Sequence, residues 1–504
     1  MGTNYQKLLG QVNEIHDLEK VTWLMGWDRE VNMPDAAAGI RSKQIGTVNK
    51  LVHRMSTSDE MGELIENAAA ELEAEEAPLN GTAQSLVRFL MRDYAEKKRY
   101  PEDFVKRQAE AQGIGIQAWK AARENNDYSQ FTDCVATTIE LCQEKAEYLG
   151  YEDEKYDALL SQFERGLKTA DVRRIFNAIK EETVPLIEAI AERQDLVDDS
   201  LLHQDFPIAV QKEVAPYFAT AVGYNFDHGT ELGTAAHPFA SSLSRLDARI
   251  TTRWYPDFIS PAIFGVMHES GHAIYEQGTA ADFERTPLAR GTSMGIHESQ
   301  SRMMENLVGR SRSFWKVHYP VLQKAFPQQL GSHSAEDFYQ AINKVSPSYI
   351  RVEADELTYN MHIMLRFELE QAMVNGDVTA AQLPEAWNSK MKELLGVVPP
   401  TDTLGCLQDI HWTGTSFGYF PTYALGNFYS VQLLEAAQAQ EPSIQEDLDK
   451  GSTVALKKWL GENIHQHGKK YDPPELVTMA TGRPLDHKPF VAYAKAKFGE
   501  LYTL

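Results

Sequence analysis

The sequence predicts one large, mainly helical unit with a small β element near its middle. Most segments place apolar residues three and four positions apart, as at Leu8 and Val12, which is the period of an amphipathic helix. Only residues 248–254, rich in Thr and Ile, read as a convincing strand. The sequence contains no internal repeat, low-complexity tract or Gly/Ser linker, so we expect residues 1–504 to form a single domain.

The amphipathic segments give the expected helices in order along the chain. They are 5–25, 38–55, 59–75, 83–97, 102–124, 130–148, 170–194, 206–222, 335–345, 350–374, 380–394, 427–440 and 452–464. We expect breaks where Pro, Gly and Ser cluster, for example at Gly331-Ser332 and Pro473-Pro474. The strand at 248–254 ends before Pro256, and residues 235–242 are its expected partner.

The composition disfavours several classes of protein. A formal charge of −23 and a pI near 5.1 argue against a nucleic-acid partner, because phosphate binding needs a basic surface. The chain has no run of 18 apolar residues, so we expect no membrane span. The N-terminus lacks a signal-peptide pattern, and Cys134, Cys142 and Cys406 form no CxxC pair, which suits a reducing compartment. We therefore expect a soluble cytoplasmic protein.

The motif His268-Glu269-Ser270-Gly271-His272 predicts a metal site on a helix around residues 262–277. Residues four apart project from the same helix face, so His268 and His272 can reach one ion. Glu269 lies one step round the helix, where it can act on a water as general base instead of ligating the metal. The alternative is a surface helix that carries two unconnected histidines.

A zinc site of this kind needs a third protein ligand and an open position. The downstream candidates are Glu276, Glu284, His297, Glu298 and Glu305. We choose Glu298, because a helix that begins at about residue 295 would supply the carboxylate from a second element. His297 is the alternative on spacing alone.

Six ordered motifs then resemble those of the M32 family of metallocarboxypeptidases, the thermostable carboxypeptidase 1 type. They are His237–Phe239, Asp247–Thr251, His268–His272, His297–Arg302, Ile350–Asp355 and Gly405–Trp412. The resemblance spans essentially the whole chain. It implies a nearly all-helical fold with a deep groove, related to neurolysin and angiotensin-converting enzyme, and a small sheet beside the metal helix. It also implies removal of C-terminal residues from peptides, one divalent ion per subunit held by His268, His272 and Glu298, and a homodimer.

A carboxypeptidase must bind a terminal carboxylate, and a guanidinium does so through paired hydrogen bonds. We choose Arg351, which forms a polar stripe with Asp355, Thr358 and His362 on the helix expected at 350–374. An ordinary i,i+4 ion pair between Arg351 and Asp355 is the alternative. For Arg249 and Arg302 we expect structural ion pairs.

The resemblance also implies a His and a Tyr that donate hydrogen bonds to the tetrahedral oxyanion. We place these roles on His411 and Tyr423, beside the Gly- and aromatic-rich segment 414–426, with Tyr419 as the alternative tyrosine. His237 is expected near the substrate through its family motif. For His411, Tyr423 and His237 alike, a buried aromatic side chain with a satisfied polar atom is the competing interpretation.

The predicted activity is hydrolysis of the C-terminal peptide bond of peptides with a free C-terminus, with broad specificity. Glu269 takes the proton of the attacking water and returns it to the leaving amine. Zinc is the expected ion, with cobalt and manganese as alternatives. Two other functions stay open: a related oligopeptidase or dipeptidase, and a catalytically silent helical protein that binds peptides in its groove.

Overall fold

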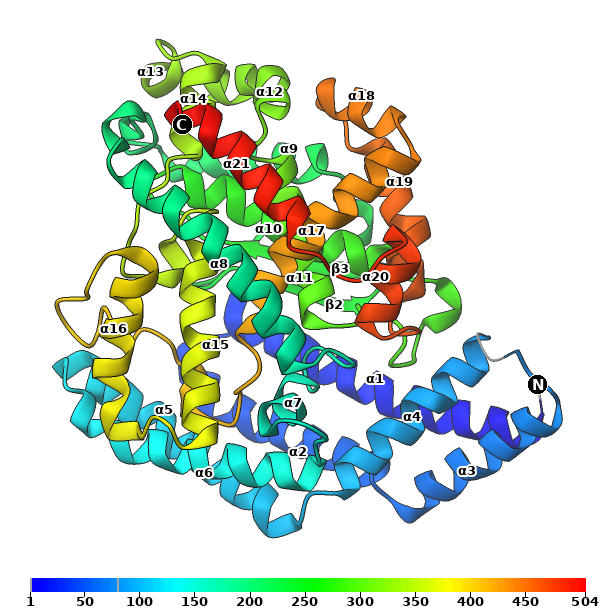
Figure 1. The fold of residues 1–504 in the computed structure, drawn as a ribbon. Coiled ribbons are helices and arrows are strands. Elements are labelled where there is room, and N and C mark those ends of the chain that lie inside the picture. Colours follow the sequence, from blue (N-terminus) through cyan, green and yellow to red (C-terminus); the bar gives the residue numbers. More distant parts are fainter. Residues whose placement is uncertain (1, 79–80) are drawn as a thin grey trace.

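The computed structural model describes residues 2–78 and 81–504 and is dominated by helices (Figure 1). The first half contains α1 (Thr3–Val31), α2 (Ala38–Ser56), α3 (Asp59–Ala74), α4 (Thr82–Lys98), α5 (Glu102–Asn125), α6 (Thr132–Leu149), α7 (Lys155–Leu160), α8 (Thr169–Ala191) and α9 (Ile208–Ala221). The second half contains α10 (Ser260–Gln277), α11 (Met294–Arg302), α12 (Arg312–Ala325), α13 (Pro327–Leu330), α14 (Ala335–Ile342), α15 (Tyr359–Asn375), α16 (Leu383–Leu395), α17 (Pro421–Gln440), α18 (Ser443–Asp449), α19 (Val454–Asn463), α20 (Pro473–Thr481) and α21 (Lys488–Tyr502). The predicted fold class, mainly helical with a small sheet, is confirmed. None of the helices in the described residues is long and apolar enough to cross a membrane.

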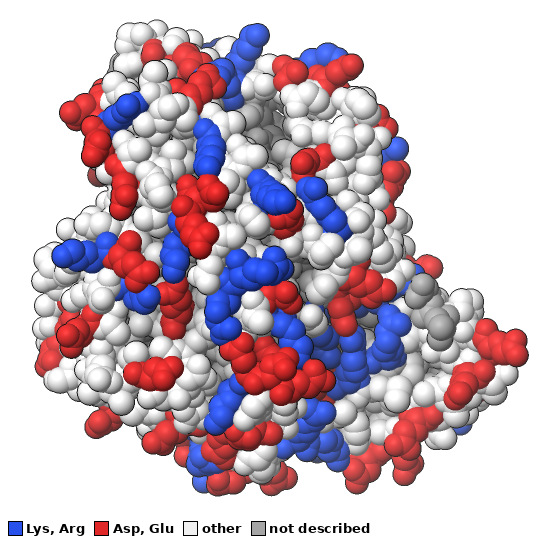
Figure 2. Space-filling model, in the orientation of Figure 1, with Lys and Arg blue, Asp and Glu red and all other residues white. Residues whose placement is uncertain are grey.

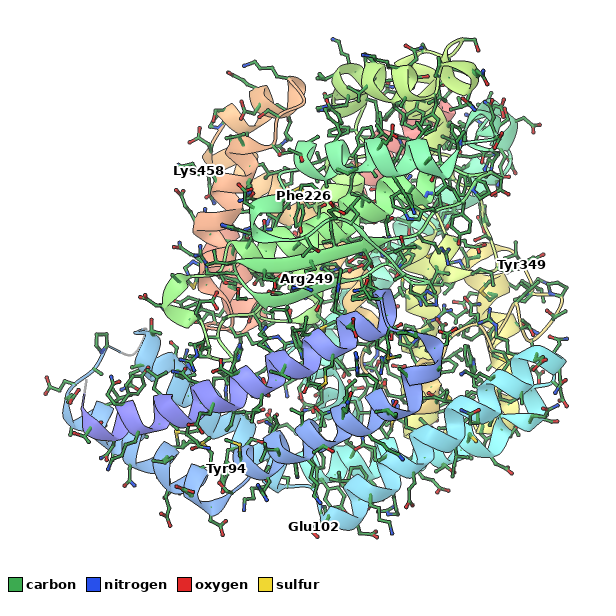
Figure 3. The ribbon with its side chains drawn as sticks, turned by 180° about the vertical axis from the view of Figure 1, so that it is seen from behind. Tyr94, Glu102, Phe226, Arg249, Tyr349 and Lys458 are labelled. Carbon is green, nitrogen blue, oxygen red and sulfur yellow. The ribbon has the colours of Figure 1, made fainter. Side chains whose placement is uncertain are left out.

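The small sheet has the order β1-β3-β2 and consists of β1 (Gly233–Thr234), β2 (Ala240–Ser244) and β3 (Asp247–Thr252). β2 pairs antiparallel with β3, so the expected strand and its partner are both present. β1 pairs with β3 in parallel. Seen from behind, the strands lie directly over α1, and Arg249 is labelled on β3 (Figure 3). Because β2 stands at the edge of the sheet, one side of its backbone is free to face the site described below.

Buried apolar side chains form two clusters. The larger one extends through most of the helices from α6 onward, while the smaller one joins α1, α3 and α4 through Leu8, Ile65 and Leu86. In Figure 1 these N-terminal helices lie along the lower edge, away from α12–α14. The single-domain assignment for residues 1–504 stays a prediction.

Two glycines allow three central helices to pack closely. A side chain at Gly271 of α10 would collide with the backbone of Gln300 in α11, and one at Gly426 of α17 would collide with Glu298. Glycine is therefore required at both positions for this close backbone approach. α11 contacts both α10 and α17 in the centre of the molecule (Figure 1).

The helix predicted over 350–374 begins only at Tyr359. Asp355 accepts hydrogen bonds from the backbone N–H groups of Leu357 and Thr358, which belong to a turn before the helix. Arg351 instead lies in a separate 3₁₀ turn. The predicted polar stripe on one helix is wrong, as is the alternative ion pair between Arg351 and Asp355, because Arg351 pairs with Asp409.

Candidate metal centre

His268 and His272 lie one turn apart on α10, and Glu298 faces them from α11. Oε2 of Glu298 is 3.7 Å from Nε2 of His268 and 3.4 Å from Nε2 of His272. One ligand atom from each of the three residues lies within 4.8 Å of the others. The structure therefore brings together the three residues chosen from the sequence as metal ligands.

Each histidine is oriented through its second ring nitrogen. Nδ1 of His268 is 2.8 Å from Oε2 of Glu305, which lies in a wide π-helical turn after α11. Nδ1 of His272 is 2.5 Å from Nδ1 of His297, whose Nε2 is 2.7 Å from Oε1 of Glu276. Such supporting contacts set the tautomer that leaves Nε2 free for a metal and raise the basicity of the ligand.

His297 is thus placed as a support for His272 rather than as a third ligand. Both of its ring nitrogens are engaged, one by His272 and the other by Glu276. Glu276 also does not reach the ligand set, although it projects from the same helix. Sequence spacing does not distinguish Glu298 from His297 as the third ligand, because either residue requires only that a second helix pack against α10.

Charged neighbours and burial set the protonation of the site. Glu298 is buried, but Arg302 and His268 hold its pKa well below the usual range, so that its carboxylate stays ionised. Arg302 donates to Oε1 of Glu298 at 2.7 Å, which leaves Oε2 for the histidines. Burial raises the pKa of Glu269 to about 7. Glu269 is 5% exposed and forms no ion pair with any described residue.

The ligand set opens into a cleft with a volume of about 510 Å³. Glu269 lines it, as do the edge of β2 at residues 240–242 and the aromatic side chains of Phe163, Tyr419 and Tyr423. An edge strand beside a cleft can pair with an extended peptide through backbone hydrogen bonds. The cleft therefore has the form of a peptide site with a carboxylate beside its candidate metal ligands.

The donor set fits a divalent ion. Two imidazole nitrogens and one carboxylate oxygen converge, each imidazole has a supporting acceptor, and the side of the set toward the cleft is open. This combination is that of a catalytic site for a divalent metal ion with three protein ligands and an open position.

The sequence matches the family model described as Carboxypeptidase Taq (M32) metallopeptidase over residues 7–498. The chain belongs to the M32 family of metallocarboxypeptidases. The match covers α1 to α21, including α10 and α11 with the ligand set. The predicted family and the predicted metal-dependent carboxypeptidase class are confirmed.

Relatives of known name and solved structure agree with this assignment. The chain is 38% identical to "Carboxypeptidase 1" of Bacillus subtilis, with 95% of each chain covered, and 37% identical to "Thermostable carboxypeptidase 1" of Thermus thermophilus, with 99% of each covered. The M32 carboxypeptidase from Deinococcus radiodurans superposes with a TM-score of 0.95 at 34% identity, covering all of both chains. The Pyrococcus furiosus carboxypeptidase gives a TM-score of 0.93 at 36% identity, covering 99% of both.

Of the two candidate tyrosines, both line the cleft. The hydroxyl of Tyr423 lies 3.4 Å from that of Tyr419. The ring of His411 stacks on Tyr419 at 5.5 Å and lies 6.5 Å from Tyr423. His411 is packed against these tyrosines but does not itself line the cleft, and burial lowers its pKa to about 4.

Arg351 lies next to the same aromatic group, buried and 6% exposed. Its guanidinium is 5.1 Å from the ring of Tyr423 and donates to Asp409 at 2.9 Å. It does not line the cleft in this structure.

His237 is exposed in the loop before β2, although the two residues that follow it do line the cleft. The ion pairs expected for Arg249 and Arg302 are present, with Asp247 and with Glu298 and Glu305 respectively.

Sequence reasoning missed three cleft residues that come from distant segments: Trp23 of α1, Arg290 before α11 and Lys469 before α20. None stands in a motif, and only the packing of the chain brings them together. The support of His272 by His297 and Glu276 was also missed, although both residues had been weighed as ligands.

His297→Phe is expected to weaken metal affinity by about 10–100-fold, because His272 loses the group that orients it. The variant should still bind the ion when the ion is supplied in excess. Titration of the metal-free protein, with bound metal measured by elemental analysis, tests this. Unchanged affinity would remove the orienting role, and complete loss of binding at all concentrations would restore His297 as a ligand.

Proposed function

We propose that the cleft hydrolyses the last peptide bond of peptides with a free C-terminus, with Glu269 as general base. A divalent ion held by His268, His272 and Glu298 would act as a Lewis acid on the scissile carbonyl and lower the pKa of the attacking water. The observation that carries the proposal is the unpaired carboxylate of Glu269 beside a convergent ligand set in an open cleft.

Glu269 is placed to move the proton. It follows His268 in the chain, lines the cleft and is held by no ion pair among the described residues, so a water in the cleft is its natural partner. It removes the proton from that water and delivers it to the leaving amine.

Tyr423 and His411 are our proposed donors to the oxyanion, with Tyr419 as the alternative to Tyr423. The two tyrosines line the cleft, which supports a donor role for one of them. Loss of one such donor costs about 2.7–4 kcal/mol of transition-state stabilisation. His411 stacks on Tyr419, next to the side chains that line the cleft.

For the terminal carboxylate we propose Arg351. Asp409 pairs with both Arg351 and Arg366, so these three groups together carry one surplus positive charge. A substrate carboxylate would compensate that charge, and burial makes such a bidentate contact stronger than it would be in water. His237 remains a proposed neighbour of the substrate through its position before Pro238 and Phe239.

Zinc is the ion we propose, since two imidazoles and a carboxylate suit it, while cobalt and manganese accept the same donors. A cytoplasmic location and a homodimer are likewise proposals, the first drawn from the sequence pattern and the second from the family resemblance.

A C-terminally amidated peptide is expected to react about 10–100-fold more slowly than the free acid, because it loses a charge-assisted contact of roughly 1.5–3 kcal/mol. Cleavage of matched N-acetylated peptides, followed by mass spectrometry of the products, measures this and identifies the bond that breaks. Equal rates, or cleavage further from the end, would indicate an oligopeptidase instead.

A further inference from the structure

Two cations, Arg290 and Lys469, line one end of the cleft, and a third, Lys20, lies beside them. Lys20 of α1 and Arg290 lie against the same ring, with Nζ and Cζ at 4.2 and 4.1 Å from the centroid of Trp23. Lys469 is held beside them, because its backbone N–H donates to Leu288 at 3.1 Å. Lys20 also reaches β2, where it donates to the carbonyl of Ser242 at 2.7 Å.

These three side chains lack carboxylate partners. Within residues 2–78 and 81–504 no carboxylate oxygen lies within 4.0 Å of their charged nitrogens, whereas the buried cations Arg302, Arg351 and Lys497 each have a carboxylate partner. Glu276, the carboxylate whose charge acts on all three, contacts Nε2 of His297 through Oε1 at 2.7 Å, and its buried Oε2 has no hydrogen-bond partner among the described residues. Burial, with the charge of Arg290, lowers the pKa of both Lys20 and Lys469 to about 8. Unpaired like charges destabilise the fold, so their retention in a cleft indicates a ligand of opposite charge.

The cations lie on the His272 side of the ligand set. His272 contacts His297, and His297 contacts Glu276. Glu276 also accepts a hydrogen bond at 3.3 Å from the N–H of Gly291, the residue next to Arg290. On the other side of the ligand set, His268 contacts Glu305, which pairs with Arg302. Arg302 lies over the ring of Tyr359, and the hydroxyl of Tyr359 accepts a hydrogen bond from Arg351. A peptide whose terminal carboxylate lies toward Arg351 must therefore extend its upstream residues toward the cations.

We propose that Arg290 and Lys469, with Lys20 beside them, form a subsite that selects peptides with acidic side chains on the amino-terminal side of the scissile bond. This proposal rests on the carboxypeptidase function proposed above. A Glu or Asp side chain would supply the missing counter-charge, and the guanidinium of Arg290 can bind it through two hydrogen bonds.

The distribution of charge supports an acidic ligand. The protein carries a formal charge of −23, which would repel acidic peptides in general. Yet Lys and Arg side chains gather on the face shown in Figure 2, in the region between α7, α4 and α20. Gln162 and Phe163, which follow α7, and Lys469, which precedes α20, line the cleft.

The test compares two N-acetylated pentapeptides that differ only in the second and third residues before the scissile bond, Glu-Glu in one and Gln-Gln in the other. The wild-type holoenzyme should favour the acidic peptide by about tenfold in kcat/KM, which corresponds to roughly 1.4 kcal/mol. The preference should shrink as salt is raised, because the pairs are partly exposed. In Arg290→Gln/Lys469→Gln the ratio should fall to about one.

The matched control removes two positive charges elsewhere. Lys316 and Lys458 are exposed on α12 and α19, and Figure 3 labels Lys458 at the surface. Lys316→Gln/Lys458→Gln should keep the wild-type ratio. Equal kcat/KM for the two peptides in the wild type would overturn the subsite without any variant, and so would a preference that survives in the cleft variant. If neither peptide loses its C-terminal residue, the proposed function fails instead.

Discussion

Glu269→Gln is expected to lower kcat by about 10²–10⁴-fold while the protein keeps its metal, because the amide cannot accept the proton of the attacking water. The substitution preserves the shape of a buried side chain that is 5% exposed and forms no ion pair with any described residue. Removing the charge should therefore leave the fold intact. Because the variant no longer buries a carboxylate charge, its Tm should be at or above that of the wild type.

The control for this prediction is Glu231→Gln, an exposed carboxylate outside the cleft. It should retain wild-type kcat and metal content. Turnover is measured on an N-acetylated peptide by C-terminal residue release, and metal content by elemental analysis of both variants. Full activity in Glu269→Gln would exclude it as the base, whereas loss of activity together with loss of metal would assign it a structural role.

The metal helix was predictable because its signal is local. His268 and His272 are one turn apart, so the sequence alone places them on one face, and the structure has α10 at Ser260–Gln277 against a predicted 262–277. The choice of Glu298 needed only a second helix, which begins at Met294 against a predicted start at about 295. The spacing of residues in the sequence does not predict the close packing at Gly271 and Gly426 that brings α11 to the histidines.

The errors have a common physical origin in long-range contacts. The apolar period predicts a helix through 350–374 that includes Arg351, but Asp355 stabilises a turn before Tyr359, and Asp409, 58 residues away, binds the guanidinium. The two cleft cations and Lys20 beside them likewise come from two loops and from α1, and no local pattern distinguishes them from surface charges. Local periodicity predicts elements, whereas ion-pair partners follow from the tertiary fold.

Glu298→Gln is expected to reduce metal affinity by more than roughly 100-fold, because a ligand itself is replaced. Loss of a residue that only supports a ligand costs at most about that much. The amide keeps nearly the same volume against Gly426, so packing of α11 on α17 should persist. At a metal concentration of 100 times the wild-type Kd, the wild type should gain about 2.7 kcal/mol of stability from the ion, and the variant little. The Tm of each protein with and without added zinc measures this independently of activity.

Ser301→Ala is the matched control for Glu298→Gln. The hydroxyl of Ser301 donates to Oε2 of Glu298 at 3.1 Å, so its loss should leave the carboxylate in place and weaken binding far less. Together with His297→Phe, the three variants should rank in metal affinity as Ser301→Ala, then His297→Phe, then Glu298→Gln. Wild-type affinity in Glu298→Gln combined with complete loss in His297→Phe would reverse the assignment, because it would make the imidazole of His297 the third ligand and Glu298 the support. The rank order therefore decides whether Glu298 or His297 is the third metal ligand.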